Sequence, residues 1–132
     1  QNTDGREHLC TMDPFDFERL IADYFMRRGF VHAEVIGRSG DRGVDVLATN
    51  IHGEYELIQC KRYRQGNNIG STPIQRVHSY MRTRNASRAW VITTSDFTPE
   101  GRDEARITNV TLMNGQDLLQ SLELYYPGRF CL

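Results

Sequence analysis

Three residues on two neighbouring predicted strands have side chains that suit phosphate chemistry. Asp45 opens the first strand, and Gln59 and Lys61 lie near the end of the second strand, Tyr55–Tyr63. Strand side chains alternate between faces, so Gln59 and Lys61 point the same way. If the strands pair as a hairpin across Thr49–Glu54, Asp45 lies opposite them at cross-strand distance. A carboxylate, an amide oxygen and an ammonium at one spot suit a hard divalent cation beside a phosphate and an attacking water.

Lys61 stands out by composition as well as by position. It is the only lysine among 16 basic residues, and all the others are arginine. Arginine is a permanently charged planar fork, whereas the lysine ammonium is a compact charge whose pKa shifts readily. Lysine can therefore orient or deprotonate a water molecule. The one lysine of the chain thus occupies the position at which hydrolytic chemistry would require it.

Each of the three residues also has a structural explanation. Asp45 could be a structural acid bonded to backbone amides. Gln59 could be a polar residue on an exposed sheet face, and Lys61 could be the charge that protects an edge strand from pairing. Each explanation is plausible for one residue, but the three are less plausible together, so the sequence favours a shared site.

Length and composition place the chain among single-domain globular proteins. It has 132 residues, of which 39% are hydrophobic and 25% charged, enough for one core. No apolar run approaches the roughly 20 residues of a membrane helix, and no signal peptide is evident. The chain begins with glutamine and not methionine, so we expect it to be a fragment of a longer protein that has an upstream domain.

Cysteine and histidine usage argues against a zinc site. The three cysteines show no metal-ligand spacing, and the four histidines are scattered. An odd number of cysteines without a framework indicates reduced thiols, and therefore a cytoplasmic protein.

The charges are distributed unevenly, although the net charge is only −1. Residues 57–95 contain no acid, whereas the acids gather in the first predicted helix and around Asp96–Glu104. The basic residues of this window are Lys61, Arg62, Arg64, Arg76, Arg82, Arg84 and Arg88. A basic middle against acidic ends is typical of a surface that faces phosphates, although a solvated charged face without a partner is the alternative.

The hydrophobic pattern predicts an α/β fold with the element order α-β-β-β-α-β-α-β-α. This order favours three layers, in which a mixed central sheet is flanked by helices on both sides. We expect a flexible leader over 1–12, the domain over 13–124 and a C-terminal tail over 125–132.

Three helix starts combine a capping residue with a proline. These are Asp13-Pro14, Thr72-Pro73 and Thr98-Pro99, and each places proline at the first helical position. Thr72 and Gln75 also have capping-box spacing. On the first helix, Glu18 lies at the edge of the apolar stripe, where it is either a satisfied structural acid or a site residue.

The pattern around these residues resembles a known family. Asp45 and Gln59-Cys60-Lys61, preceded by Arg38–Gly43, resemble the PD-(D/E)xK nuclease superfamily, and more narrowly the catalytic domain of Mrr-type restriction endonucleases. In these enzymes glutamine replaces the usual second acid. The similarity continues through Trp90–Thr98 and Val110–Leu118, and covers most of the chain.

The resemblance implies a restriction-endonuclease-like fold and a metal-dependent DNA endonuclease. It implies that Asp45, the Gln59 amide oxygen and the Cys60 backbone carbonyl bind Mg²⁺, with Mn²⁺ as a substitute. Lys61 would position and activate the attacking water. Glu18, on the first helix as in similar nucleases, would bind the metal directly or through water.

The resemblance also implies double-stranded DNA as the substrate and a homodimer as the assembly. The residues expected to contact DNA are Arg38, Arg42, Arg62, Arg64, Arg76 and Gln75. Two alternatives stay open at this point: a DNA-binding module without turnover, and a structure-selective nuclease acting on branched DNA or RNA.

Overall fold

The computed structural model of the chain describes residues 5–37 and 43–130. Within these ranges the elements are α1 (Gly5–Thr11), α2 (Pro14–Arg27), β1 (His32–Val35), β2 (Val46–Thr49), β3 (Tyr55–Lys61), α3 (Ser71–Thr83), β4 (Ala86–Thr93), α4 (Pro99–Thr108), β5 (Thr111–Met113) and α5 (Gly115–Tyr125). The predicted order is confirmed, with α1 added in front of it.

The strands form one mixed sheet in the order β1-β2-β3-β4-β5. β1, β2 and β3 pair antiparallel, and β3, β4 and β5 pair parallel. Because β2 and β3 run in opposite directions, the start of β2 lies beside the end of β3. Because β3 and β4 run in the same direction, their carboxyl ends lie side by side. These three chain segments therefore meet at one edge of the sheet.

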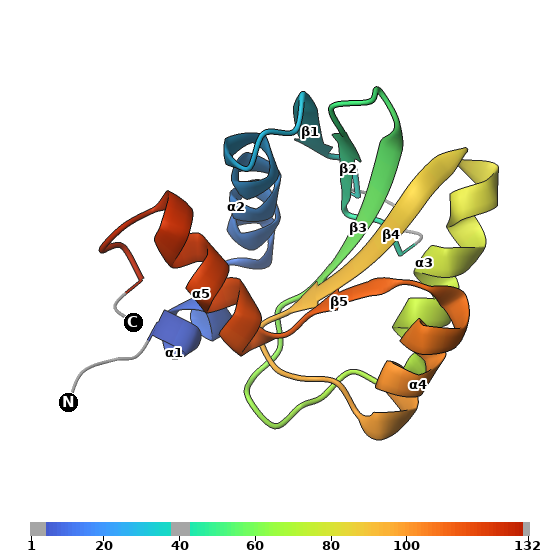
Figure 1. Cartoon of the computed structure of the whole chain (residues 1–132). Helices are drawn as coiled ribbons and strands as arrows, with labels where there is room; N and C mark the ends of the chain where they lie inside the picture. The colour runs from blue at the N-terminus through green and yellow to red at the C-terminus, as the bar shows by residue number, and fades with distance from the viewer. Residues whose placement is uncertain (1–4, 38–42, 131–132) are drawn as a thin grey trace.

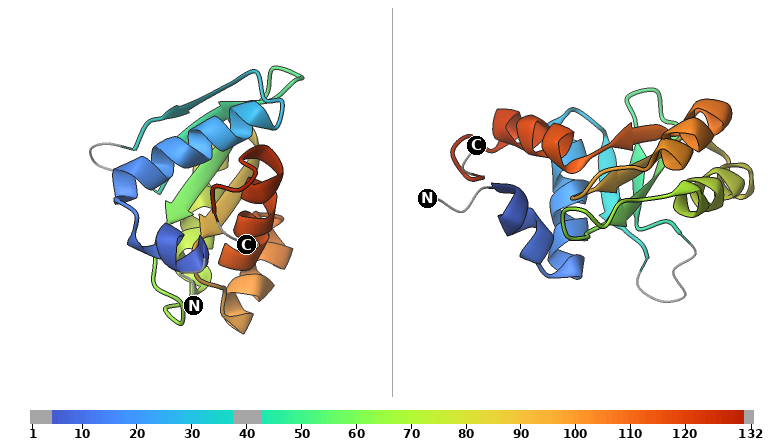
Figure 2. Two further views of the ribbon diagram at one scale, coloured as in Figure 1. Left: turned by 90° about the vertical axis from the view of Figure 1, so that its left-hand side faces the viewer. Right: turned by 90° about the horizontal axis from the view of Figure 1, so that it is seen from below.

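Helices cover both faces of the sheet, so the predicted three-layer α/β architecture is confirmed (Figure 1). One apolar cluster joins α2 and α5 to one sheet face, and includes Ile58, Trp90 and Ile92. The other joins α3 and α4 to the opposite face, and includes Leu57 and Val91. Figure 2 shows the sheet between these layers from two further sides. β3 and β4 thus bury both faces, as expected for interior strands.

The helix boundaries follow local capping chemistry at most positions. The Asp13 side chain accepts hydrogen bonds from Phe15 N and Asp16 N at the start of α2. Thr98 caps α4 through Gly101 N. α2 is followed by Gly29, whose φ of 112° is readily adopted only by glycine. The predicted starts at Pro14 and Pro99 are therefore confirmed.

The start of α3 differs from the prediction. The helix begins at Ser71 and its N-cap is Gly70, which provides no side-chain hydrogen bond. The capping box of Thr72 and Gln75 is therefore wrong, because the helix starts before the threonine.

The two ends of the described chain also differ from the prediction. Residues 5–11 of the expected flexible leader form α1, in which Leu9 is fully buried. In the expected tail, Tyr126 and Phe130 are buried in the cluster that contains Leu9. Close packing explains the difference, since a Cβ on Gly5 would lie 1.9 Å from the Phe130 carbonyl oxygen. None of the helices in residues 5–37 and 43–130 has the length and apolar character needed to cross a membrane.

Candidate active site at the end of strand β3

Asp45 and Gln59 lie opposite each other where β2 begins. The β2–β3 register pairs Val46 with Ile58, and the amide of Asp45 continues it by donating to the Ile58 carbonyl at 2.9 Å. Asp45 therefore stands just before β2, at the position across from Gln59. The cross-strand arrangement predicted from side-chain alternation is present.

Direct hydrogen bonds join Asp45 to β3. Asp45 Oδ2 accepts from Gln59 Nε2 at 2.6 Å and from the Cys60 backbone amide at 2.8 Å. Asp45 is 5% exposed and Gln59 is 4% exposed. Both bonds are therefore largely shielded from water, which strengthens them relative to bonds in solution.

A small hollow of about 280 Å³ opens beside this pair. Its lining combines the predicted catalytic residues with two neighbours from the start of α2 and two residues that follow β3. The lining residues are Pro14, Phe17, Glu18, Asp45, Gln59, Cys60, Lys61, Arg62 and Tyr63. The structure thus brings Glu18, from a separate helix, to the same hollow as Asp45 and Lys61.

The oxygen atoms at this site suit a hard cation. Gln59 Nε2 donates both to Asp45 Oδ2 and, at 3.3 Å, to the Cys60 carbonyl oxygen. Two of the oxygens expected to hold a metal ion therefore converge on one point, which here holds an electropositive amide group. Oxygen ligands from carboxylate, carbonyl and amide groups are those that Mg²⁺ prefers, so the residues present fit that ion.

The orientation of Gln59 differs from its expected role. The amide presents its nitrogen to Asp45 and Cys60, so it donates instead of supplying an oxygen ligand. Its role as an oxygen ligand stays a prediction, and requires the amide to rotate. Among the described residues, no group of three or more His, Cys, Asp and Glu side chains is placed to hold a metal ion. A site here would depend on amide and carbonyl oxygens as well as carboxylates.

The thiol of Cys60 reports the negative potential of the site. Burial raises the pKa of the Cys60 thiol well above its ordinary value, and the charges of Asp45 and then Glu18 raise it further. Cys60 packs against the apolar cluster beneath α2. Both carboxylates are therefore close enough to act on one group, which is the environment that a bound cation would neutralise.

The structure bears on each structural explanation that the sequence left open. Gln59 is not on an exposed sheet face, because it is buried. Lys61 does not protect an edge strand, because β3 pairs with both β2 and β4. The structural explanation of Asp45 holds in part, since its carboxylate accepts a bond from the Cys60 amide.

The predicted DNA-contacting residues lie in different places. Arg76 is exposed on α3, and its Cγ and Cδ lie against Gly43, beside the Gln59 side-chain oxygen. Gln75 is exposed on the same helix and does not line the hollow. Arg38 and Arg42 lie outside the described residues.

The two arginines after β3 have separate surroundings. Arg62 Nη1 donates to the Cys10 carbonyl at 2.6 Å, so its guanidinium holds the end of α1. Arg64 is exposed and lines a neighbouring hollow of about 420 Å³ with Glu7, Cys10, Thr11 and Gln65. Arg64 is thus the more accessible of the two for a phosphate.

Sequence analysis did not identify Tyr63, Thr93 and Thr94 as part of this region. The Lys61 ammonium nitrogen lies 5.9 Å from the centre of the Tyr63 ring. Thr93 is the last residue of β4 and Thr94 follows it, and their hydroxyls bond the backbone of Lys61 and Tyr63. The available signal was the pair of threonines after the apolar run of β4, because polar side chains at the end of a buried strand need hydrogen-bond partners nearby.

The mixed sheet with Asp45, Gln59 and Lys61 around one hollow has the arrangement implied by the resemblance to PD-(D/E)xK nucleases. Family comparison agrees. The Mrr catalytic-domain family, described as "Restriction endonuclease", matches residues 9–122. The chain therefore belongs to this restriction endonuclease family.

Individual relatives are consistent with this assignment. The chain is 30% identical over 120 residues to the type IV methyl-directed restriction enzyme EcoKMrr of Escherichia coli K12, covering 86% of this chain and 39% of that protein. The chain therefore spans about two fifths of the length of this relative.

Two solved structures share the fold. The MspJI restriction endonuclease in complex with a 27-mer oligonucleotide matches with a TM-score of 0.68 and 20% identity, over 93% of this chain and 32% of that one. The DNA modification-dependent restriction endonuclease AspBHI matches with a TM-score of 0.67 and 18% identity, over 94% and 36%.

Proposed function

We propose that this chain is the catalytic domain of a Mg²⁺-dependent endonuclease that hydrolyses phosphodiester bonds in double-stranded DNA. The observation that carries the proposal is the convergence of Glu18, Asp45, Gln59 and Lys61 on one hollow. Membership of a restriction endonuclease family supports the same activity.

The roles of the residues follow from their chemistry. Asp45 and the Cys60 carbonyl would hold Mg²⁺, with Gln59 through its amide oxygen and Glu18 directly or through water. When bound, the cation withdraws charge from the phosphate and lowers the pKa of a coordinated water. Lys61, which lines the same hollow, would position the attacking water through its ammonium group and activate it by stabilising the negative charge that develops on its oxygen. Mn²⁺ would substitute, since it accepts the same oxygen ligands.

Exposed arginines near the hollow would hold the DNA backbone. Arg76 and Arg64 flank the site from α3 and from the segment after β3. Phosphate contacts fix the register of a protein on DNA without reading its sequence. Arg38, Arg42 and Gln75 remain predicted contacts, and Arg62 would contribute by holding α1 in place.

The relatives favour modified DNA as the substrate of the complete protein. EcoKMrr is described as methyl-directed and AspBHI as DNA modification-dependent. We propose that cleavage by the protein to which this domain belongs also depends on DNA modification. The proposal concerns the whole protein and not this domain alone, because the chain covers only part of each relative. We also propose that this protein is cytoplasmic, that its cysteines are reduced thiols, and that it acts as a homodimer.

A plasmid assay tests the activity. Purified chain is incubated with supercoiled plasmid and Mg²⁺, with unmethylated and methylated plasmid in parallel, beside the Lys61→Ala variant. We expect nicking or linearisation by the native chain, and a loss of about 100-fold or more for Lys61→Ala, the usual contribution of a positioned acid–base group.

The matched control is Arg82→Ala, which removes a positive charge from the far end of α3 and not from the hollow. DNA binding without cleavage by the native chain would favour the binding-module alternative. Equal nicking by the native chain and Lys61→Ala would remove Lys61 from the mechanism, and cleavage of only branched DNA or RNA would favour the structure-selective alternative.

A further inference from the structure

Three hydroxyl side chains at the carboxyl end of β4 are fully buried beside the segment that carries Lys61. Thr93, Thr94 and Ser95 each have 0% exposure. The β3–β4 ladder ends at the pair Lys61 and Thr93. Beyond that pair the regular ladder ends, and side-chain bonds join the backbone bonds that hold the chain after β3 in place.

Thr93 holds the backbone of Lys61 itself. Its Oγ1 donates to the Lys61 carbonyl at 2.8 Å, and the same carbonyl accepts from the Thr94 amide at 3.2 Å. Two donors on one carbonyl fix the orientation of that peptide group. The Lys61 Cα, from which the long side chain extends, is fixed with it.

Thr94 holds the residue whose ring lies next to the lysine. Its Oγ1 accepts from the Tyr63 amide at 2.8 Å and donates to the Tyr63 carbonyl at 2.5 Å. The Tyr63 ring centre lies 5.9 Å from Lys61 Nζ. An aromatic face at this distance attracts an ammonium, so Tyr63 limits where the end of the lysine side chain can go.

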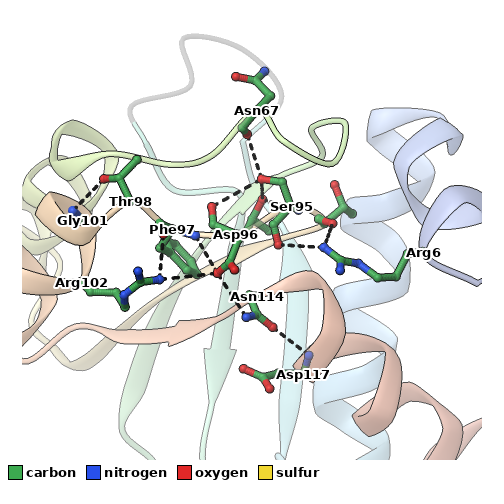
Figure 3. Close-up of polar contacts among 12 residues, drawn as sticks. Arg6, Asn67, Ser95, Asp96, Phe97, Thr98, Gly101, Arg102, Asn114 and Asp117 are labelled. Atoms are coloured by element: carbon green, nitrogen blue, oxygen red, sulfur yellow. Dashed lines mark hydrogen bonds and ion pairs between the residues drawn. The ribbon is translucent and has the colours of Figure 1, made fainter.

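The chain at the end of β4 is itself anchored by α1 and by the segment after β3. Arg6 Nη2 donates to the carbonyls of Thr94 and Ser95, both at 3.3 Å, and Ser95 Oγ donates to the Asn67 carbonyl at 2.8 Å (Figure 3). α1 is thus tied to Thr94 and Ser95, and the segment after β3 is tied to Ser95 as well. The threonine hydroxyls act from a fixed frame and not from a loose chain end.

We infer that Thr93 and Thr94 are positioning residues that set the place of Lys61, Thr93 through the lysine backbone and Thr94 through Tyr63. The inference rests on the proposed function, in which Lys61 acts on the attacking water. A four-carbon side chain has many conformations, so a reaction that depends on its ammonium needs the backbone and one wall of its surroundings to be fixed.

The sole lysine provides a direct probe. In the full 132-residue chain without added lysines, ¹³C-labelled lysine yields a single side-chain Cε signal, because Lys61 is the only lysine. This signal is recorded for the native chain, for Thr93→Val and Thr94→Val, which remove only the hydroxyl, and for Thr93→Ser and Thr94→Ser, which keep it. Single-turnover cleavage with saturating DNA and Mg²⁺ is measured in parallel.

We expect both valine variants to shift or broaden the Lys61 signal and to lower the maximal cleavage rate by about 10- to 100-fold, the usual result of misplacing a reacting group by a small distance. The DNA concentration that gives half-maximal cleavage, measured in the same way at lower DNA concentrations, should change little. Both serine variants should keep the native signal and most of the rate. The matched control is Thr108→Val, whose hydroxyl bonds the Glu104 carbonyl within α4 at 2.7 Å.

A native Lys61 signal in folded Thr93→Val and Thr94→Val would overturn the inference. If the valine variants do not fold, two other results would overturn the inference. One is a shifted Lys61 signal in either serine variant. The other is an unchanged Lys61 signal in Tyr63→Ala, which removes the ring beside the ammonium. Absence of cleavage by the native chain would instead contradict the proposed function, and leaves the signal as an independent test of positioning.

Discussion

Two buried carboxylates, Asp45 just before β2 and Glu56 on β3, have opposite surroundings. Asp45 lies beside the carboxyl end of β3 and is 5% exposed, and Glu56 lies near the amino end of β3 and is 7% exposed. Each accepts two short hydrogen bonds from other described residues. Neither burial nor the number of these bonds distinguishes the two acids.

The donors and the neighbours do distinguish them. Glu56 accepts from Trp90 Nε1 and from Asn50 Nδ2, both at 2.9 Å, and so ties the β2–β3 turn to the core tryptophan. Asp45 instead faces a hollow that it shares with Glu18 and Lys61. A carboxylate that closes a hydrogen-bond network stabilises the fold, whereas a carboxylate beside a second acid and a lysine at an opening has the surroundings that the proposed catalytic role requires.

Exchanging each acid for its amide should separate these roles most strongly. We expect Asp45→Asn to lower cleavage by about 1,000-fold, the upper end for removing one group from a charged transition-state site. The free energy of unfolding should change little, because the amide keeps an oxygen for the Cys60 amide and eases the repulsion from Glu18. Plasmid cleavage and urea unfolding of the same preparations measure both quantities.

Glu56→Gln is the matched control and should behave in the opposite way. The amide nitrogen of the new glutamine would face a donor on Asn50 or Trp90, where it cannot accept a hydrogen bond. The free energy of unfolding should therefore fall by about 1 to 3 kcal/mol. Cleavage per folded molecule should be unchanged. A large loss of activity for Glu56→Gln, with Asp45→Asn fully active, would reverse the assignment of the two acids.

The hydrogen-bond partners of the two acids allow a second comparison. Gln59→Glu adds a carboxylate beside Asp45, and Asn50→Asp adds one beside Glu56. Both variants should melt at a lower temperature than the native chain without metal, because like charges are brought together. We expect Mg²⁺ to restore the melting temperature of Gln59→Glu but not that of Asn50→Asp. Mg²⁺ should also bind Gln59→Glu roughly tenfold more tightly than it binds the native chain, since an added anionic ligand strengthens a hard-cation site.

Calorimetric titration and thermal melting with and without Mg²⁺ check this comparison. Tighter Mg²⁺ binding by the native chain than by Gln59→Glu would contradict it. If Mg²⁺ also restored the melting temperature of Asn50→Asp, the two ends of β3 would not differ in the way proposed.

The smallest expected effect concerns the Cys60 thiol. Its pKa is raised by burial and by Asp45 and Glu18, so the folded chain keeps this proton at a pH where the unfolded chain has lost it. The associated stability is complete below the ordinary thiol pKa and is lost as the pH rises above it. Urea unfolding from about pH 7 to about pH 10 should therefore show a steeper loss for the native chain than for Cys60→Ser.

The same thiol also reports on the comparison of the two acids. Asp45→Asn should lower the Cys60 pKa and increase its rate of reaction with a thiol reagent at mildly alkaline pH, because the thiolate is the reactive form. Glu56→Gln should leave this rate unchanged. Equal acceleration by both variants would indicate that Asp45 does not act on Cys60 specifically.

Local sequence patterns account for much of the fold and for the pairing of Asp45 with Gln59 in the candidate site. Asp13-Pro14 and Thr98-Pro99 start helices as predicted, since capping depends on a few adjacent residues. Strand alternation and a short turn were enough to predict that Asp45 and Gln59 face each other. Thr72 failed as a cap because Gly70 and Ser71 already begin the helix.

Other features depend on contacts between distant segments. The burial of Leu9 in α1 comes from packing with Tyr126 and Phe130 at the other end of the chain. Arg62 bonds a carbonyl 52 positions away, and Thr94 bonds Tyr63 across 31 positions. No local pattern distinguishes an arginine that holds α1 from one that meets a phosphate.

The amino-acid sequence by itself determined which chemical groups are available and which strand face carries them, because side-chain type and the two-residue repeat of a strand are local properties. It thus determined that an acid, an amide and the only lysine lie at the same end of two neighbouring strands. Only the tertiary structure decided that Glu18 joins them, that the Gln59 nitrogen faces Asp45, and that the end of β4 holds Lys61. These depend on how a helix and a parallel strand, separate in the chain, pack against β3.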